Sequence, residues 1–158
     1  MTSLYQSMLD EASSGRMLSH REVSRFTPDQ IRQTIAELVA QNRVDLADAL
    51  SAAGLSLYPD NEEILAISAL LAEMRQDWVT AGQLLQQLIN VQDGRSPVST
   101  WQHWIRVLRC LVEPVAAMHA VDCALQIYPD HPALLDEKES IEALLASSHA
   151  HEAASQTH

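Results

Sequence analysis

Aromatic residues are scarce in this chain: Phe, Trp and Tyr make up 4% of its 158 residues, although 47% of the residues are hydrophobic. A β-sandwich relies on aromatic and β-branched residues, whereas closely packed helices are rich in Ala and Leu, which are abundant here. The composition therefore predicts an all-α chain. Its length suits one compact domain, and its hydrophobic content is sufficient for a core.

Basic residues are also few, since 10 Lys and Arg stand against 21 Asp and Glu, for a net charge of −11. A negative surface repels phosphate, which disfavours nucleic acid and anionic membranes as partners. No stretch reaches the roughly 18 to 20 apolar residues that span a bilayer, and the first residues lack the pattern of a secretory signal. We expect a cytoplasmic protein without membrane insertion, whose protein partner presents a basic or apolar surface.

Only two cysteines are present, Cys110 and Cys123, which is too few for a disulfide framework and does not match a metal-binding spacing. Both lie in apolar helical segments, which predicts small buried thiols, although paired antiparallel helices would also allow a bridge. His103, His119 and His131 have no Ser, Cys or carboxylate at the spacing of a catalytic motif. The sequence therefore predicts no catalytic residue, no cofactor and no metal site; an enzyme remains only as a remote alternative.

Two nearly identical seven-residue segments, called the repeated phrases below, indicate an internal repeat. Gly54-Leu-Ser-Leu-Tyr-Pro-Asp60 and Ala124-Leu-Gln-Ile-Tyr-Pro-Asp130 have their prolines 70 residues apart. This spacing is about twice the period of roughly 34 residues found in arrays of helix pairs. Each phrase ends an amphipathic stretch at a proline, which indicates the end of a helix.

Helix starts lie between these ends. Thr27-Pro28-Asp29-Gln30 reads as a capping box with proline in the first turn, and Asp60 with Glu63 predicts the cap of a helix that begins at 62. Ser96-Pro97 and Glu113-Pro114 predict two further starts. The pattern is one of paired helices.

These residues resemble the tetratricopeptide repeat (TPR) family over about residues 27–130. Three repeats fit, at 28–61, 62–97 and 98–131, and Trp101 stands at the family's signature aromatic position. The chain departs from the family pattern at Ile35 and Ile105, which replace a small residue, and at Asp93, which replaces the final proline of the second repeat. The resemblance implies a TPR-like α-solenoid of about three helix pairs, with 132–146 as a C-terminal capping helix.

In the TPR family, the inner helices line a concave groove that binds a partner. The resemblance assigns the following groove positions here: Asp29, Arg32, Ala36, Glu63, Ala66, Leu70, Glu73, Met74, Gln102, Arg106 and Arg109. Ala66, Leu70 and Met74 would form an apolar floor, and Arg106 with Arg109 would hold a carboxylate or a helix end.

A second interpretation of the two arginines stays open, in which they are solvated surface residues paired with Glu63 or Glu73. Apolar Ala36 and Leu70 stand where the co-chaperones that grip C-terminal carboxylates would have polar clamp residues. The resemblance therefore argues against a heat-shock co-chaperone.

The small, acidic chain also resembles the TPR-like chaperones of bacterial type III secretion, most strongly over Glu63 to Ala81 and Trp101 to Leu111. That resemblance implies a chaperone or adaptor that masks an amphipathic helix of a secretion subunit in its groove. The alternative is a scaffold that holds folded proteins together or assembles with itself. Homodimerisation through the first or last helix is compatible with both.

The two ends of the chain lie outside the repeats. Residues 1–26 contain two short apolar stripes, one on a helix that ends near Ser13 to Gly15, and would pack as an N-terminal cap, lie in the groove or mediate self-association. Residues 147–158 contain His149, His151 and His158 but little apolar content, which predicts a disordered tail. Trp101 is expected in the core, whereas the place of Trp104 stays open.

Overall fold

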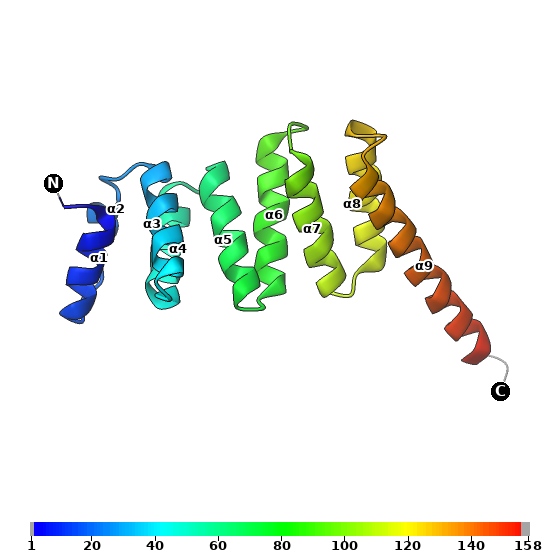
Figure 1. The fold of residues 1–158 in the computed structure, drawn as a ribbon, viewed down its shortest axis with the longest axis horizontal. Coiled ribbons are helices and arrows are strands. Elements are labelled where there is room, and N and C mark those ends of the chain that lie inside the picture. The colour runs from blue at the N-terminus through cyan, green and yellow to red at the C-terminus, as the bar shows by residue number, and fades with distance from the viewer. Residues whose placement is uncertain (1, 156–158) are drawn as a thin grey trace. The chain divides into compact units, whose positions relative to one another are not determined.

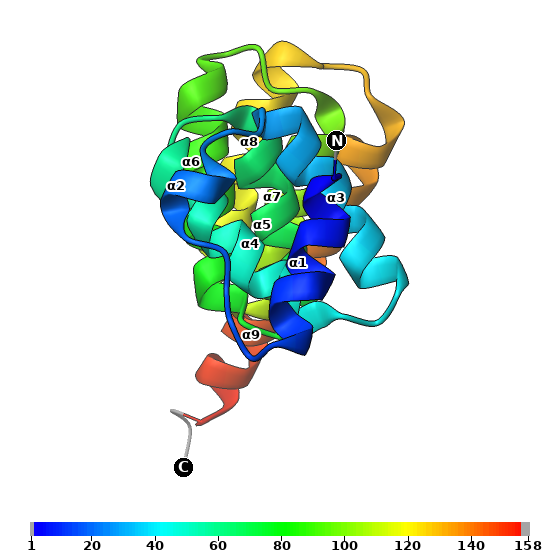
Figure 2. The same cartoon turned by 90° about the vertical axis from the view of Figure 1, so that its left-hand side faces the viewer.

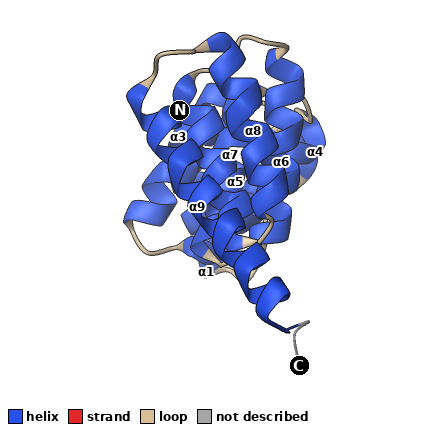
Figure 3. Cartoon of the chain, turned by 90° about the vertical axis from the view of Figure 1, so that its right-hand side faces the viewer, coloured by secondary structure: helices blue, strands red, loops and turns tan. Residues whose placement is uncertain are grey.

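The computed structural model describes residues 2–155. All regular secondary structure in that range is helical, which confirms the all-α prediction (Figures 1 and 3). The helices are α1 (Leu4–Ser13), α2 (His20–Val23), α3 (Pro28–Ala40), α4 (Val44–Leu57), α5 (Glu62–Met74), α6 (Trp78–Gln92), α7 (Val98–Cys110), α8 (Pro114–Ile127) and α9 (Pro132–Ser155). They form two compact units, of which unit 1 ends at Val91 and unit 2 begins at Gln92.

Helix starts follow the capping signals of the sequence, with one exception. Thr27 and Gln30 form the predicted capping box of α3, with Pro28 in the first turn. The cap of α5 is Asn61, whose side chain accepts hydrogen bonds from the backbone N–H groups of the second and third helical residues. The prediction of Asp60 as this cap is wrong, because the helix begins one residue later than that cap would require. Asp60 instead accepts a hydrogen bond from Gln87 Nε2 at 3.2 Å.

Four helices end in the same hydrogen-bonded turn, the Schellman motif. In each, one residue has a positive φ: 75° at Gly15, 57° at Asn42, 59° at Gln76 and 58° at Val112. The next backbone N–H bonds back to a carbonyl five residues earlier, in the pairs Arg16 to Glu11, Arg43 to Leu38, Asp77 to Ala72 and Glu113 to Leu108, at 2.8–3.0 Å. This closure ends α1, α3, α5 and α7 and starts the turn to the following segment.

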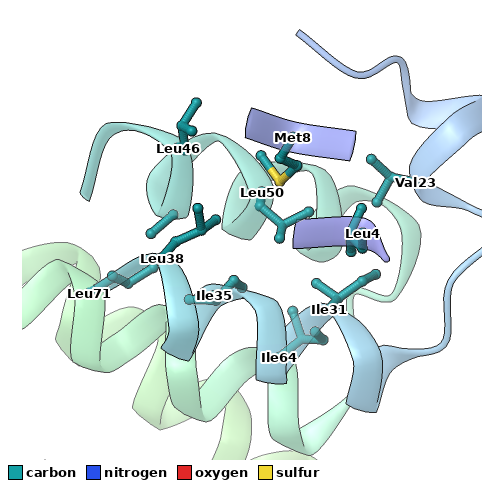
Figure 4. Packing of buried hydrophobic residues seen from close by; sticks show 11 residues of the cluster. Leu4, Met8, Val23, Ile31, Ile35, Leu38, Leu46, Leu50, Ile64 and Leu71 are labelled. Atoms are coloured by element: carbon teal, nitrogen blue, oxygen red, sulfur yellow. The ribbon is translucent and has the colours of Figure 1, made fainter. Parts of the chain in front are cut away.

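The core of unit 1 joins the N-terminal segment to the first repeat. Leu4 and Met8 of α1 and Val23 of α2 are buried in one cluster with residues of α3, α4 and α5 (Figure 4). Contacts of α1 with α3 and of α2 with α4 place the segment on the outside of the first helix pair (Figure 2). Of the three arrangements considered for residues 1–26, the structure thus shows the packed N-terminal cap.

A glycine allows α4 to pack tightly against two isoleucines of this core. Gly54 of α4 is buried, and a Cβ atom at this position would lie 3.3 Å from Ile31 Cγ2 and 3.4 Å from Ile64 Cγ2. The corresponding residue of the third repeat is Ala124, which is buried in unit 2. The first phrase therefore begins with Gly because two β-branched side chains occupy the space beside the helix.

In unit 2, α8 packs against both α7 and α9 (Figure 1). Trp101 and Ile105 of α7, Ala117, Val121 and Ala124 of α8, and Leu134 and Ile141 of α9 are buried. Trp101 is in the core as expected. Trp104 is half-buried, and its ring centroid lies 6.0 Å from that of Trp101 at an interplanar angle of 45°, a usual geometry for an aromatic pair.

The tyrosine of each repeated phrase makes the same long-range hydrogen bond. Tyr58 Oη donates to the Phe26 carbonyl at 3.0 Å, and Tyr128 Oη donates to the Ser96 carbonyl at 2.9 Å. Both bonds connect residues 32 apart. Each hydroxyl therefore ties the end of a helix pair to the segment that leads into the same pair.

The last helix is longer than the sequence predicted. α9 continues to Ser155, so the predicted disordered tail is wrong for residues 147–155, and residues 156–158 lie outside the described range. Several alanines favour helix here, and the hydroxyls of Ser147 and Ser148 donate to the Leu144 carbonyl. None of the described helices is long and apolar enough to cross a membrane.

Candidate functional site

Unit 1 presents the first group of predicted site residues on two neighbouring helices. Asp29, Arg32 and Ala36 recur every three or four residues on α3, so they share one face of that helix. Arg32 donates to Asp29 Oδ1 at 2.9 Å and lies 3.5 Å from Glu63 Oε2 of α5. The hydrogen bond to Asp29 raises the pKa of the Arg32 guanidinium. Because these side chains are largely solvated, the network orients them and contributes little stability.

An apolar strip follows on α5. Leu70 and Met74 are one helical turn apart, with 48% and 55% of their surfaces exposed, while Ile64, Leu65, Ala69 and Leu71 of the same helix are buried. The period of the helix therefore places Leu70 and Met74 away from the core. Half-buried Ala66 lies one turn before Leu70, and half-buried Glu73 lies beside Met74 in sequence. Ala66, Leu70 and Met74 are the three apolar residues that the sequence predicted for the floor of the groove on this helix.

Unit 2 contains a cavity of about 740 Å³ between α7, the α7–α8 turn and α9. The lining residues are Gln102, Arg106, Arg109 and Cys110 from α7, Val112 and Glu113 from the turn, Pro114 from the start of α8, and Glu137, Ile141, Leu144 and Ser148 from α9. The α9 residues recur at intervals of three or four, which places them on one helical face. Three predicted site residues, Gln102, Arg106 and Arg109, thus lie in one cavity.

An ion pair forms one side of this cavity. Arg109 Nη1 donates to Glu137 Oε2 at 2.7 Å, and Arg109 Nη2 donates to Ser140 Oγ at 3.1 Å. The sequence predicted Glu63 or Glu73 as the partner of the arginines in their solvated interpretation. For Arg109 the structure shows Glu137 of α9 instead, and Glu63 pairs with Arg32. A charge-assisted pair of this kind fixes the guanidinium in the cavity wall.

The cysteines differ from the prediction of buried thiols. Cys110 is exposed and Cys123 is half-buried, and both are free. Cys110 follows Gln102 and Arg106 at four-residue intervals, so it lies on the cavity face of α7, opposite the core residues Trp101, Ile105 and Leu108. Cys123 Sγ lies 3.7 Å from His119 Nε2 on α8.

Sequence reasoning missed the α9 half of the cavity. The sequence predicts only a capping role for residues 132–146, although Glu137, Ile141 and Leu144 recur at intervals of four and three residues and so share one face of the helix. For Val112 to Pro114 the sequence predicts only the end of one helix and the start of the next.

No protein-family model matches the chain, and no curated protein matches it in sequence. Solved structures do match in fold. The first TPR of Spaghetti (RPAP3) bound to the HSP90 peptide SRMEEVD is similar with a TM-score of 0.64 and 15% identity, over 75% of this chain and 93% of that one.

Two structures of MamA are also similar. MamA AMB-1 has a TM-score of 0.67 and 17% identity over 89% of this chain and 79% of that one. MamA MSR-1 has a TM-score of 0.65 and 15% identity over 92% of this chain and 87% of that one. At such identities the likeness concerns the fold alone, and it confirms the predicted class: the chain has a TPR-like fold of paired helices.

Proposed function

We propose that this chain is a protein-interaction module that binds an amphipathic helix of its partner. The observation that carries the proposal is the unit 2 cavity, because it combines apolar and charged groups. Leu144 and Val112 offer exposed apolar surface beside the guanidinium groups of Arg106 and Arg109. Its 740 Å³ falls in the range of about 300–1,000 Å³ typical of binding pockets.

The strip on α5 supports the same function in unit 1. Exposed Leu70 and Met74 offer apolar surface, and methionine adapts readily to different partners. Arg32, Asp29 and Glu63 supply oriented charges beside it. Burying the apolar face of a helix against such surfaces would remove its tendency to aggregate without any chemical reaction.

The partner that fits best is a small helical subunit of a bacterial secretion system, as in the chaperones that the sequence resembles. The acidic balance of the chain, −11, favours a partner with basic residues. Peptide binding occurs in the similar RPAP3 structure, which holds an HSP90 peptide. An HSP90-type tail is not the ligand proposed here, because Ala36 and Leu70 provide no polar clamp at those positions.

The test is a pull-down from the source cells, with mass spectrometry and size-exclusion chromatography of the bound material. One small helical subunit in stoichiometric amount supports the chaperone. Several large folded proteins would point to a scaffold, and recovery of the chain alone as an oligomer would point to self-assembly.

Charge reversal tests the site itself. The double variant Arg106→Glu with Arg109→Glu should lose at least about tenfold in affinity for the captured partner, because the two guanidinium groups are placed to hold the carbonyl end of the bound helix and carboxylates would repel it. A matched control is Arg21→Glu with Arg25→Glu, which changes the net charge equally on exposed residues outside the proposed site. Circular dichroism must show unchanged helicity, and equal affinity of both variants would place the binding surface elsewhere.

A further inference from the structure

Val112 occupies a position that disfavours valine. It has a φ of 58° in the turn that closes α7, where the three corresponding turns have Gly15, Asn42 and Gln76. A left-handed backbone is readily adopted by Gly and tolerated by Asn. A β-branched residue in this conformation is a genuine outlier, because its side chain crowds the neighbouring carbonyl.

Exposure of the Val112 side chain to water is a second unfavourable feature of this position. Val112 exposes 82% of its surface, more than any other large apolar side chain described. A polar residue would thus suit this turn on two grounds, backbone conformation and contact with water. Backbone strain of this kind concentrates at functional sites, where another requirement outweighs stability.

The surroundings of Val112 indicate that the requirement that outweighs stability at this position is contact with a partner. Val112 and Glu113 line the unit 2 cavity from the turn and Pro114 from the start of α8, and Leu144 lines it from α9 with 46% of its surface exposed. We call these four residues the turn rim. It offers apolar surface with one exposed carboxylate, that of Glu113, while the nearby Arg109 already donates to Glu137.

We propose that the turn rim is the contact that selects the partner, and that its occupant is an amphipathic helix whose apolar stripe is flanked by Lys or Arg. Val112 and Leu144 would contact the apolar stripe, and Glu113 would attract the basic flank. The net charge of −11 acts in the same direction. This inference rests on the proposed function and adds to it the chemistry of the partner and the residue that recognises it.

Two synthetic helices test the proposal. Both carry the same stripe of Leu, one flanked by Lys and the other by Glu, and each is labelled for fluorescence anisotropy. A second measurement shows whether the helix binds at the cavity: it records how far the bound helix protects Cys110 from alkylation by iodoacetamide. A Cys123→Ser background is used, since Cys110 lines the cavity and Cys123 does not. The Lys-flanked helix should bind more tightly and protect Cys110.

The informative variant is Val112→Asn, and its matched control is Gln76→Asn in the corresponding turn of unit 1. Both should raise the urea midpoint of unfolding, because Asn tolerates a positive φ. Only Val112→Asn should weaken binding of the Lys-flanked helix, by about tenfold, the loss expected for one buried valine contact. Val112→Gly repeats the test with a residue that the turn accepts without strain.

Failure of this inference can be distinguished from failure of the proposed function. If the Lys-flanked helix protects Cys110 and Val112→Asn binds it unchanged, the turn rim is not the selecting contact, while the proposed function stands. If the Glu-flanked helix binds more tightly than the Lys-flanked helix, the proposal that the partner helix has a basic flank is wrong. If neither helix binds or protects Cys110, helix binding at the cavity is refuted and this inference with it.

Discussion

Replacing Tyr58 or Tyr128 with Phe removes one hydroxyl group and leaves each ring in place. In the folded chain these hydroxyls donate to the carbonyls of Phe26 and Ser96, at 3.0 and 2.9 Å. Both rings are half-buried, so packing in the variants should be retained. The substitution therefore measures the hydrogen bond that ties the end of a helix pair to its beginning.

Each substitution should lower the free energy of unfolding by about 0.5–1.5 kcal/mol, the usual net value of one intramolecular hydrogen bond. Tyr58 lies in unit 1 and Tyr128 in unit 2, and they share no bonding partner. The double variant should therefore lose about the sum of the two single losses, since independent sites add to within roughly 0.5 kcal/mol.

Urea unfolding followed by far-UV circular dichroism gives these values. Tyr5→Phe is the control, because Tyr5 is a partly buried tyrosine that takes part in neither bond. If both single variants unfold within about 0.3 kcal/mol of the control, the reasoning fails, and the repeated tyrosine must be explained by the packing of its ring.

Three further predictions concern packing, pH and the last helix. Gly54→Leu should cost about 1–3 kcal/mol or more in urea unfolding, because even a Cβ atom at this position would lie 3.3 Å from Ile31 Cγ2; a loss no larger than that of an exposed Ala52→Leu control would contradict the packing. The Ser19 backbone N–H and hydroxyl hold the pKa of Glu22 below its ordinary value, so ionised Glu22 stabilises the folded state, and this contribution is lost as the pH falls through the folded-state pKa. Glu22→Gln should accordingly lower the melting temperature at neutral pH and converge with the wild type in acid, and a difference independent of pH would refute the capping role. Removing residues 149–158 should change the free energy of unfolding by less than about 0.5 kcal/mol, because residues 149–155 are all exposed, and a larger loss would mean that the end of α9 makes stabilising contacts.

Local chemistry made much of the fold predictable. Thr27, Pro28 and Gln30 specify a helix start within four residues, and the Tyr-Pro-Asp phrases mark two helix ends at the spacing of a repeat. These signals depend on backbone geometry close in sequence, so they can be read without knowing the tertiary contacts. The displaced cap at Asn61 shows their limit, because Asp60 and Asn61 are both good caps and only the exact start of α5 decides between them.

The candidate site was less predictable because it depends on contacts between helices. The resemblance to the TPR family named Gln102, Arg106 and Arg109, but the pairing of Arg109 with Glu137 joins residues 28 apart and follows from the packing of α9. Cys110 lies in an apolar segment, yet its position on the helix directs it to the cavity face of α7. The strain at Val112 is a property of the backbone, and residue types alone gave no sign of it.

The tilted pair of Trp101 and Trp104 gives unit 2 its own spectroscopic signature. Indole rings with centroids 6.0 Å apart at 45° couple their electronic transitions, so the folded pair should produce a bisignate circular dichroism band. Unit 1 contains a single tryptophan, Trp78, which has no second indole in its own unit. Loss of the band during unfolding would report on unit 2, and the intensity of Trp78 in a variant that lacks the pair would report on unit 1, so the order in which the two units unfold can be followed without any added label.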